Sequence, residues 1–353
     1  MTIVLAILVF GFLIVIHELG HFITAKLSGV QVNEFAVFMG PAIAKWKKGE
    51  TLYSIRCIPF GGYCAMEGED EESENPRSFQ RAAWWKRLII LAAGSAMNFL
   101  AGVVIIAIVL SCQPRYVAPV INNVEQWSTL GGENGLQAND RIVEFDGKRI
   151  DIYGDFTLAT AFLADGEYDI TVERNGKQIV LEDVPMERQT VKNADGSESR
   201  VYGVSFKALD TTAKSVPGRI WPTAANYVDS VVVSLKMLFT GKASFNDMTG
   251  PVGIVKTMSD VAESASTTGL AVLSILDIGA FLAINLAVMN MLPIPALDGG
   301  RVVALLLTQL IEKLTKKKID PKYEGYIHAA GMVLLLALMA IILFKDIFTI
   351  FKG

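Results

Sequence analysis

The residues best suited to chemistry are His17, Glu18 and His21, which form a His-Glu-x-x-His sequence inside an apolar run from Ile3 to Phe22. On a helix, positions four apart share a face, so both imidazoles can reach one ion while Glu18 lies beside them. Neutral imidazoles suit Zn²⁺, an open coordination position suits water, and a neighbouring carboxylate can accept the proton of that water. We therefore predict a hydrolytic site with one Zn²⁺ per chain, His17 and His21 as ligands, and Glu18 as the catalytic base.

The alternative is that these three polar residues occur together by chance on a packed helix. An ionisable side chain at the centre of a membrane costs roughly 2.5 to 3.5 kcal/mol on insertion scales, so such residues need a partner there. A metal ion is such a partner, and the apolar run around the motif therefore favours the metal site.

The composition indicates a polytopic membrane protein. Apolar residues make up 52% of the 353 residues, and the mean hydropathy is +0.40, which is too apolar for an ordinary soluble enzyme. The net charge of −4 comes without a long basic block, so we expect no nucleic-acid partner. Three cysteines, an odd and sparse set, argue against a disulfide framework. Cys57 and Cys64 could form a second metal pair, but we favour packed thiols.

Four apolar segments are long enough to span a membrane: Ile3–Ala25, Leu88–Ser111, Leu270–Leu292 and Ile327–Phe348. The first lacks a basic leader and a small-residue cleavage site, so we expect it to be retained as a helix. Lysine and arginine gather between spans one and two and between spans three and four, which predicts that both loops are cytoplasmic. Both termini and the long middle region would then lie outside, with the zinc site towards the cytoplasmic side. The residues concerned are Lys45, Lys47, Lys48, Arg56, Arg77, Arg81, Lys86 and Arg87 in the first loop, and Arg301, Lys313, Lys316, Lys317, Lys318 and Lys322 in the second.

The first loop carries two predicted strands, Val30–Val37 and Thr51–Ile58, after which Pro59-Phe60-Gly61-Gly62-Tyr63 breaks the pattern. A sheet edge beside a membrane zinc site could hold an extended peptide by main-chain hydrogen bonds. An ordinary cytoplasmic hairpin fits the pattern equally well. The acidic run Glu67–Glu74 is predicted to be a solvated, flexible loop.

The middle region, from Tyr116, alternates short strands with one helix over Asp155–Ala164. Asn175-Gly176 between two apolar runs predicts a tight hairpin. We expect a small α+β or partly open barrel domain. The stretch from Val216 to Gly241 is amphipathic and is predicted to be an interfacial helix, with a buried helix as the alternative.

The third span ends near Pro293 and Pro295, and irregular backbone at membrane depth is tolerated where it is buried in protein or lines a cavity. Asp298 follows directly and is the best third metal ligand, because a carboxylate completes a site of three protein ligands and water; the alternative is a turn-capping aspartate. Asn285 and Asn290 are five apart, so a regular helix places them on different faces. Their amides could hold a peptide backbone or serve only helix packing. We assign His328 to the membrane interface.

These residues resemble the site-2 protease family of intramembrane zinc metalloproteases, and within it the bacterial regulator-of-sigma-E protease type. The resemblance rests on His17 to His21, Gly40-Pro41, Ile58 to Tyr63, Asn98-Phe99, Gly250 to Ile254 and Asn290 to Gly300. It implies His17, His21 and Asp298 as zinc ligands, Glu18 in acid and base catalysis, and Asn285 and Asn290 in substrate positioning. The loop from Phe60 to Tyr63 would belong to the family's membrane-dipping β-hairpin, which implies Phe60, Gly61 and Gly62 as substrate-binding residues. Ala138 to Ile142 and Phe145 to Gly147 resemble a single PDZ domain, where many Gram-negative members have two.

The resemblance implies a fold with about four transmembrane α-helices, a membrane-associated β-hairpin or sheet, and an inserted extracytoplasmic PDZ-like α+β domain. We expect four regions: 1–112, the N-terminal membrane core; 116–207, the PDZ-like domain; 208–269, an amphipathic linker; and 270–353, the C-terminal membrane core. The expected enzyme is a zinc metalloprotease of the bacterial plasma membrane. It would cleave single-span membrane proteins, such as an anti-sigma factor or a remnant signal peptide, within or near their transmembrane segment. Its partners would be these substrates, the lipid bilayer and a peptide ligand of the PDZ-like domain.

Two other functions remain open from the sequence alone. A membrane metal transporter could use His17, His21 and Asp298 as a transit site, but it would need no positioned base. A non-enzymatic PDZ scaffold would leave the His-Glu-x-x-His motif unexplained.

Overall fold

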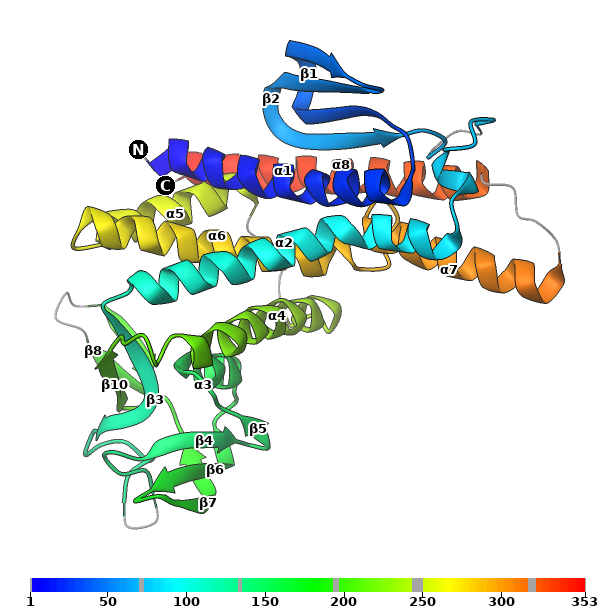
Figure 1. Cartoon of the computed structure of the whole chain (residues 1–353). Coiled ribbons are helices and arrows are strands. Elements are labelled where there is room, and N and C mark those ends of the chain that lie inside the picture. The colour runs from blue at the N-terminus through cyan, green and yellow to red at the C-terminus, as the bar shows by residue number, and fades with distance from the viewer. Residues whose placement is uncertain are drawn as a thin grey trace. The chain divides into compact units, whose positions relative to one another are not determined.

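The structure, a computed structural model, describes residues 2–69, 73–132, 135–192, 197–242, 250–316 and 322–352. The chain divides into two compact units (Figure 1). Unit 1 comprises residues 1–106 and 231–353, and unit 2 comprises residues 107–230.

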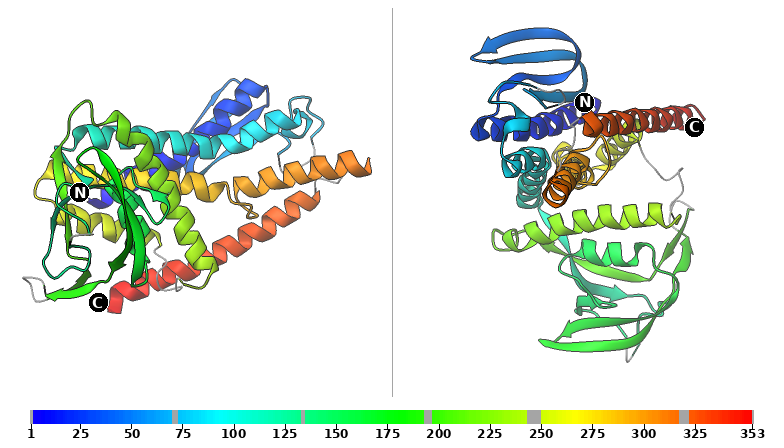
Figure 2. Two further views of the ribbon diagram at one scale, coloured as in Figure 1. Left: turned by 90° about the horizontal axis from the view of Figure 1, so that it is seen from below. Right: turned by 90° about the vertical axis from the view of Figure 1, so that its right-hand side faces the viewer.

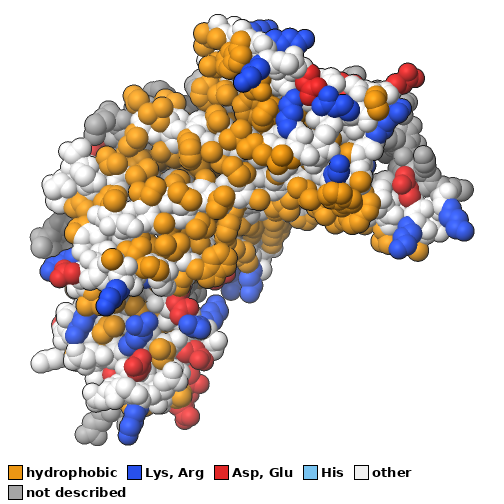
Figure 3. Space-filling view, in the orientation of Figure 1, with side chains coloured by type: hydrophobic (Ala, Val, Ile, Leu, Met, Phe, Trp, Pro, Cys, Tyr) orange, Lys and Arg blue, Asp and Glu red, His pale blue; other side chains and the backbone are white. Residues whose placement is uncertain are grey.

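Within the described residues, four helices of unit 1 are long and apolar enough to cross a membrane. They are α1 (Thr2–Ser28), α2 (Trp84–Cys112), α6 (Thr268–Asn290) and α8 (Lys322–Lys352). Each coincides with one apolar segment predicted from the sequence. Two shorter helices, α5 (Pro251–Ser264) and α7 (Asp298–Thr315), complete the helical part, over which apolar side chains are widely exposed (Figure 3). A helix satisfies its own backbone hydrogen bonds, so such a surface suits an apolar solvent.

Helices α1 and α2 approach each other closely at two glycines. A Cβ atom at Gly20 would overlap the backbone carbonyl of Ala93, and one at Gly94 would overlap the ring of His21. The two histidines of α1 therefore lie at the helix crossing. A core of buried residues joins α1, α2 and α7 to the sheet. Its members are Ala25, Val30, Val32, Cys64, Met66, Phe79, Ile90, Leu91, Val302 and Leu305.

A sheet of two long antiparallel strands, β1 (Val32–Lys48) and β2 (Thr51–Met66), lies along α1 on the side away from α2 and α6 (Figure 2). The predicted break at residues 59–63 is wrong, because β2 continues to Met66. Gly61 has φ of +71°, which lets the strand bend and pair again with β1. Ala36 thus pairs with both Ser54 and Tyr63. Among the described residues, no strand pairs with the outer side of residues 61–66, so this segment is an edge.

Unit 2 is an antiparallel sheet in the order β10-β3-β4-β6-β7, with β5 paired to β4 and helix α3 (Tyr153–Ala161) packed on it. The predicted hairpin is confirmed: Arg174 pairs with Lys177, and Asn175 and Gly176 between them both have positive φ. Helix α4 (Pro217–Phe239) confirms the predicted helix over 216–241. The strands are β3 (Arg115–Val124), β4 (Arg141–Phe145), β5 (Lys148–Arg149), β6 (Gly166–Arg174), β7 (Lys177–Met186), β8 (Gln189–Lys192), β9 (Glu198–Val201) and β10 (Val204–Asp210).

One buried ion pair ties this sheet to the loop before β4. Asp140 is fully buried, and Arg174 donates to both of its carboxylate oxygens, each at 2.7 Å. The backbone N–H of Gln137 donates to Asp140 Oδ2 at 2.8 Å. The carboxylate is therefore satisfied only while Arg174 is present.

We expect Arg174→Met to destabilise unit 2 by about 3 to 5 kcal/mol, because it leaves a buried carboxylate without its counter-charge. Hydrogen exchange of the β4 amides in the full-length protein measures the loss of protection. Arg149→Met is the matched control, since Arg149 is 81% exposed in its pair with Asp151 and surface pairs contribute little. Equal protection in the two variants would contradict the expectation.

Candidate metal centre

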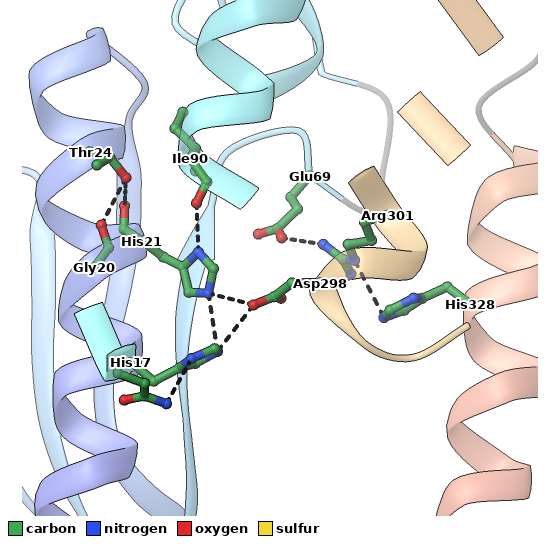
Figure 4. Close-up of polar contacts among 10 residues, drawn as sticks. His17, Gly20, His21, Thr24, Glu69, Ile90, Asp298, Arg301 and His328 are labelled. Carbon is green, nitrogen blue, oxygen red and sulfur yellow. Dashed lines mark hydrogen bonds and ion pairs between the residues drawn. The ribbon is translucent and has the colours of Figure 1, made fainter. Parts of the chain in front are cut away.

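Three side chains meet at the crossing of α1 and α2 (Figure 4). His17 and His21 belong to α1, and Asp298 is the first residue of α7. Asp298 Oδ2 lies 3.2 Å from His17 Nε2 and 3.3 Å from His21 Nε2, and the two Nε2 atoms are 3.3 Å apart. Among the described residues, this is the group whose ligand atoms gather as a metal ion requires. The structure thus brings Asp298, which is distant in the sequence, to the two histidines of α1.

The hydrogen bonds made by the Nδ1 atoms of the two imidazoles leave the Nε2 lone pair of each ring facing Asp298. His21 Nδ1 lies 2.8 Å from the carbonyl of Ile90 and donates to it, which leaves the lone pair of Nε2 facing Asp298. The Asn98 amide lies 3.4 Å from His17 Nδ1, and its Oδ1 is buried without a partner. If the oxygen and nitrogen of the Asn98 amide are exchanged, Oδ1 accepts a hydrogen bond from the Nδ1–H of His17. The Nε2 atom of His17 then has a free lone pair, as Nε2 of His21 does.

The donor set fits zinc. Bonds of about 2.0 to 2.2 Å place two ligand atoms of a tetrahedral site about 3.3 to 3.6 Å apart, which is close to the three separations observed. Asp298 Oδ2 is buried and accepts no hydrogen bond from a donor group. The N-cap residue of α7 is Leu297, and no side chain makes a capping hydrogen bond at this helix end. These observations favour a ligand over the turn-capping alternative.

Glu18 lies beside the cluster and against the edge of β2. Its carboxylate is hydrogen-bonded by the backbone of Cys64. A Cβ atom at Gly62 would stand 3.2 Å from Glu18 Cγ, so only glycine leaves this space open. The backbone of Phe60, Gly61 and Gly62 belongs to β2. The carboxylate therefore lies between the metal-binding atoms and the strand edge.

Asn285 and Asn290 lie in the last turns of α6, and both are partly buried. The helix continues to Asn290 without unwinding, and a spacing of five places the two amides on different faces. A shared role in holding one substrate would need contributions from two sides of this helix end.

Three residues near Asp298 were not predicted to belong to the site. Arg301, one helical turn beyond Asp298, donates to Glu69 and lies 3.3 Å from His328. Glu69 was expected in a solvated, flexible loop, which is wrong for this residue because its side chain is only 16% exposed. His328, predicted at the membrane interface, contacts the turn before Asp298 through the Ala296 N–H. The one signal in the sequence was that Arg301 follows Asp298 by about one helical turn, which places the two side chains on the same face. Residues 70–72 of the predicted loop lie outside the described residues.

The cysteines do not join the metal-binding group. Cys64 is buried, and burial raises the pKa of its thiol, an effect increased by the nearby carboxylate of Glu18. The prediction of a packed thiol is therefore confirmed for Cys64. It is wrong for Cys57, which is exposed.

Comparison with known proteins assigns the chain to a family. The model of peptidase family M50, the site-2 proteases, matches residues 5–338. The chain belongs to this family. It is 36% identical to a putative zinc metalloprotease of Clostridium acetobutylicum over 98% of this chain and 97% of the relative. It is 35% identical to a putative zinc metalloprotease of Fusobacterium nucleatum over the full length of both. The regulator of sigma-W protease RasP of Bacillus subtilis is 27% identical over 99% of each chain.

Family membership confirms the predicted enzyme class and its cofactor. This M50 peptidase is a zinc metalloprotease. With its long apolar helices it is an integral membrane protein.

We expect Asp298→Ala to lower zinc affinity strongly, because the site loses both a ligand and the negative charge that offsets Zn²⁺. Asp298→Asn should fall between the alanine variant and the wild type, since it retains the shape but loses the charge. A capping aspartate predicts instead a nearly normal asparagine variant. Zinc content and affinity of the purified variants distinguish the two, and full occupancy in both would remove Asp298 from the site.

Proposed function

We propose that this protease cleaves single-span membrane proteins within or near their transmembrane segment, with an anti-sigma factor or a remnant signal peptide as the substrate type. The observation that carries the proposal is the position of Glu18, between the three convergent ligand atoms and the free edge of β2. A base, a metal site and a peptide-holding edge within one small region are what hydrolysis of an extended chain requires.

The edge of β2 supports an extended substrate. A transmembrane helix hides its carbonyls in its own hydrogen bonds, so the scissile segment must unwind before it reacts. Residues 61–66 could accept that segment as an added strand, which replaces the lost helical hydrogen bonds by inter-strand ones. Gly61 and Gly62 would let its backbone come close to Glu18, and Phe60 would border it. Asn285 and Asn290, on different faces of the end of α6, would each donate to a substrate carbonyl.

Proton transfer in the proposed reaction depends on Glu18. Zinc held by His17, His21 and Asp298 supplies the positive charge that acidifies water and polarises the scissile carbonyl. Glu18 accepts the proton of the attacking water and delivers it to the leaving amine. The Cys64 backbone hydrogen bond orients this carboxylate. A metal transporter would need the three ligands but neither this base nor the strand edge, and a scaffold would need none of them.

Unit 2 supports a PDZ-like role for residues 116–207. It combines an antiparallel sheet with one helix, and β10 lies at the end of the strand order. A peptide ligand could pair with this outer strand.

We further propose that all four long apolar helices cross the plasma membrane, with both termini and the PDZ-like domain outside and the zinc site towards the cytoplasm. The lysine and arginine residues of the two inner loops support this orientation. Helix α4, with Trp221 exposed, fits an interfacial position.

We expect Glu18→Gln to retain zinc, because the three ligands remain, while proteolysis falls by at least about 10²-fold through loss of the base. The purified protein is incubated with single-span reporter segments, with and without a zinc chelator, and metal analysis accompanies the cleavage assay. Near-normal turnover by this variant would exclude Glu18 as the base.

The proposed topology predicts that Ser73 faces the cytoplasm and Ser197 the outside. Each is replaced by cysteine in a variant without the three native cysteines, and an impermeant thiol reagent is applied to intact cells. The Ser197 position should label directly, and the Ser73 position only after permeabilisation. The reverse pattern would contradict the orientation.

A further inference from the structure

The turn that carries Asp298 is folded tightly against the start of α7. A Cβ atom at Gly299 would overlap the carbonyl of Met291, and one at Gly300 would overlap the carbonyl of Ile294. Ala296, two residues before Asp298, has φ of +86°. A left-handed conformation is unfavourable for a non-glycine residue, so surrounding contacts must hold it.

Helix α8 supplies such contacts. The backbone N–H of Ala296 donates to His328 Nδ1 at 3.1 Å. Gly331 lies one turn further along the same face, and a Cβ atom there would stand 2.6 Å from the carbonyl of Pro295. Because Gly331 has no side chain, α8 can approach the turn closely. His328 then accepts the hydrogen bond from the Ala296 N–H.

A second tie runs from α7 to the sheet. Arg301 donates to Glu69, and the two side chains are only 18% and 16% exposed. The carboxylate of Glu69 also accepts the backbone N–H of Met66, the last residue of β2, at 3.4 Å. The first turn of α7 is therefore joined to the end of the strand whose edge borders Glu18 (Figure 4).

We infer that His328 is a positioning residue for Asp298, which it holds in place through the Ala296 N–H, and that Arg301 and Glu69 tie the same turn to β2. The inference rests on the proposed role of Asp298 as a zinc ligand. His328 contacts the turn before Asp298 through the Ala296 N–H. It acts by keeping the carboxylate where the two imidazoles need it, as residues outside a metal's direct ligands commonly do.

The ring of His328 allows a sharp test. A neutral imidazole accepts a hydrogen bond at one nitrogen only. Nδ1 faces Ala296, while Nε2 lies 3.3 Å from Arg301 Nε. Asparagine places a side-chain oxygen near the position of Nδ1, and glutamine places one near that of Nε2. Asparagine should therefore preserve the bond to Ala296, and glutamine should lose it.

The experiment measures zinc affinity of the full-length protein in detergent, by competition with a chromophoric chelator. We expect His328→Asn to stay near the wild type and His328→Gln and His328→Leu to bind zinc about tenfold more weakly. Gly331→Ala should weaken binding similarly, whereas Gly325→Ala, on the same helix with no atom near its Cβ position, should not. The visible spectrum of the cobalt-substituted protein should change in the weakened variants and remain unchanged in the asparagine variant.

Wild-type affinity and an unchanged cobalt spectrum in His328→Leu would overturn the inference. Rescue by glutamine and not by asparagine would overturn the role of the Ala296 bond. Wild-type affinity in Asp298→Ala would also overturn it, by removing the ligand that is positioned. Absence of proteolysis with the expected order of affinities would instead count against the proposed function and leave the positioning role supported.

Discussion

The structure of unit 1 depends on one electrostatic constraint: two imidazole lone pairs and one carboxylate oxygen converge in a largely apolar surrounding. Three acceptors within 3.2 to 3.3 Å of one another attract a cation and have no reason to gather without one. His21 cannot turn its lone pair away, because its other nitrogen donates to the carbonyl of Ile90. A divalent ion bound by these three groups would offset the cost of placing them in an apolar surrounding.

The backbone around the site is shaped by this constraint. Gly20 and Gly94 let α1 and α2 approach until the histidines fill their crossing. The buried core that includes Ile90, Val302 and Leu305 fixes the start of α7 against the end of α1. Packed cores deform little, so a carboxylate delivered by such a framework has a defined position. The glycine-rich start of α7 serves the same purpose, because Gly299 and Gly300 leave room for the carbonyls of the preceding turn.

The proposed base and the proposed substrate edge occupy adjacent positions for a related reason. A peptide held by β2 can react only if its backbone comes within reach of both the carboxylate and the ion. The bend at Gly61 returns β2 to β1 and brings the strand edge beside Glu18. The pair formed by Glu69 and Arg301 joins the end of that edge to the helix bearing Asp298. Movement of one part of the site would therefore be felt by the others.

The sequence by itself determined the elements whose signals are local. Four apolar segments of spanning length, the Asn175-Gly176 hairpin and the pairing of His17 with His21 on one helical face all follow from hydrophobicity, turn chemistry and helical period. Asp298 could be suspected from its residue type and its motif. Only the tertiary structure decided that its oxygen meets both imidazoles, because no spacing relates α7 to α1. The continuation of β2 through Gly61 depends on pairing with β1, which outweighs the local break signal. The partners of Glu69 and His328 come from α7 and the turn before it, and contacts between segments so distant in the chain leave no periodic trace in the sequence.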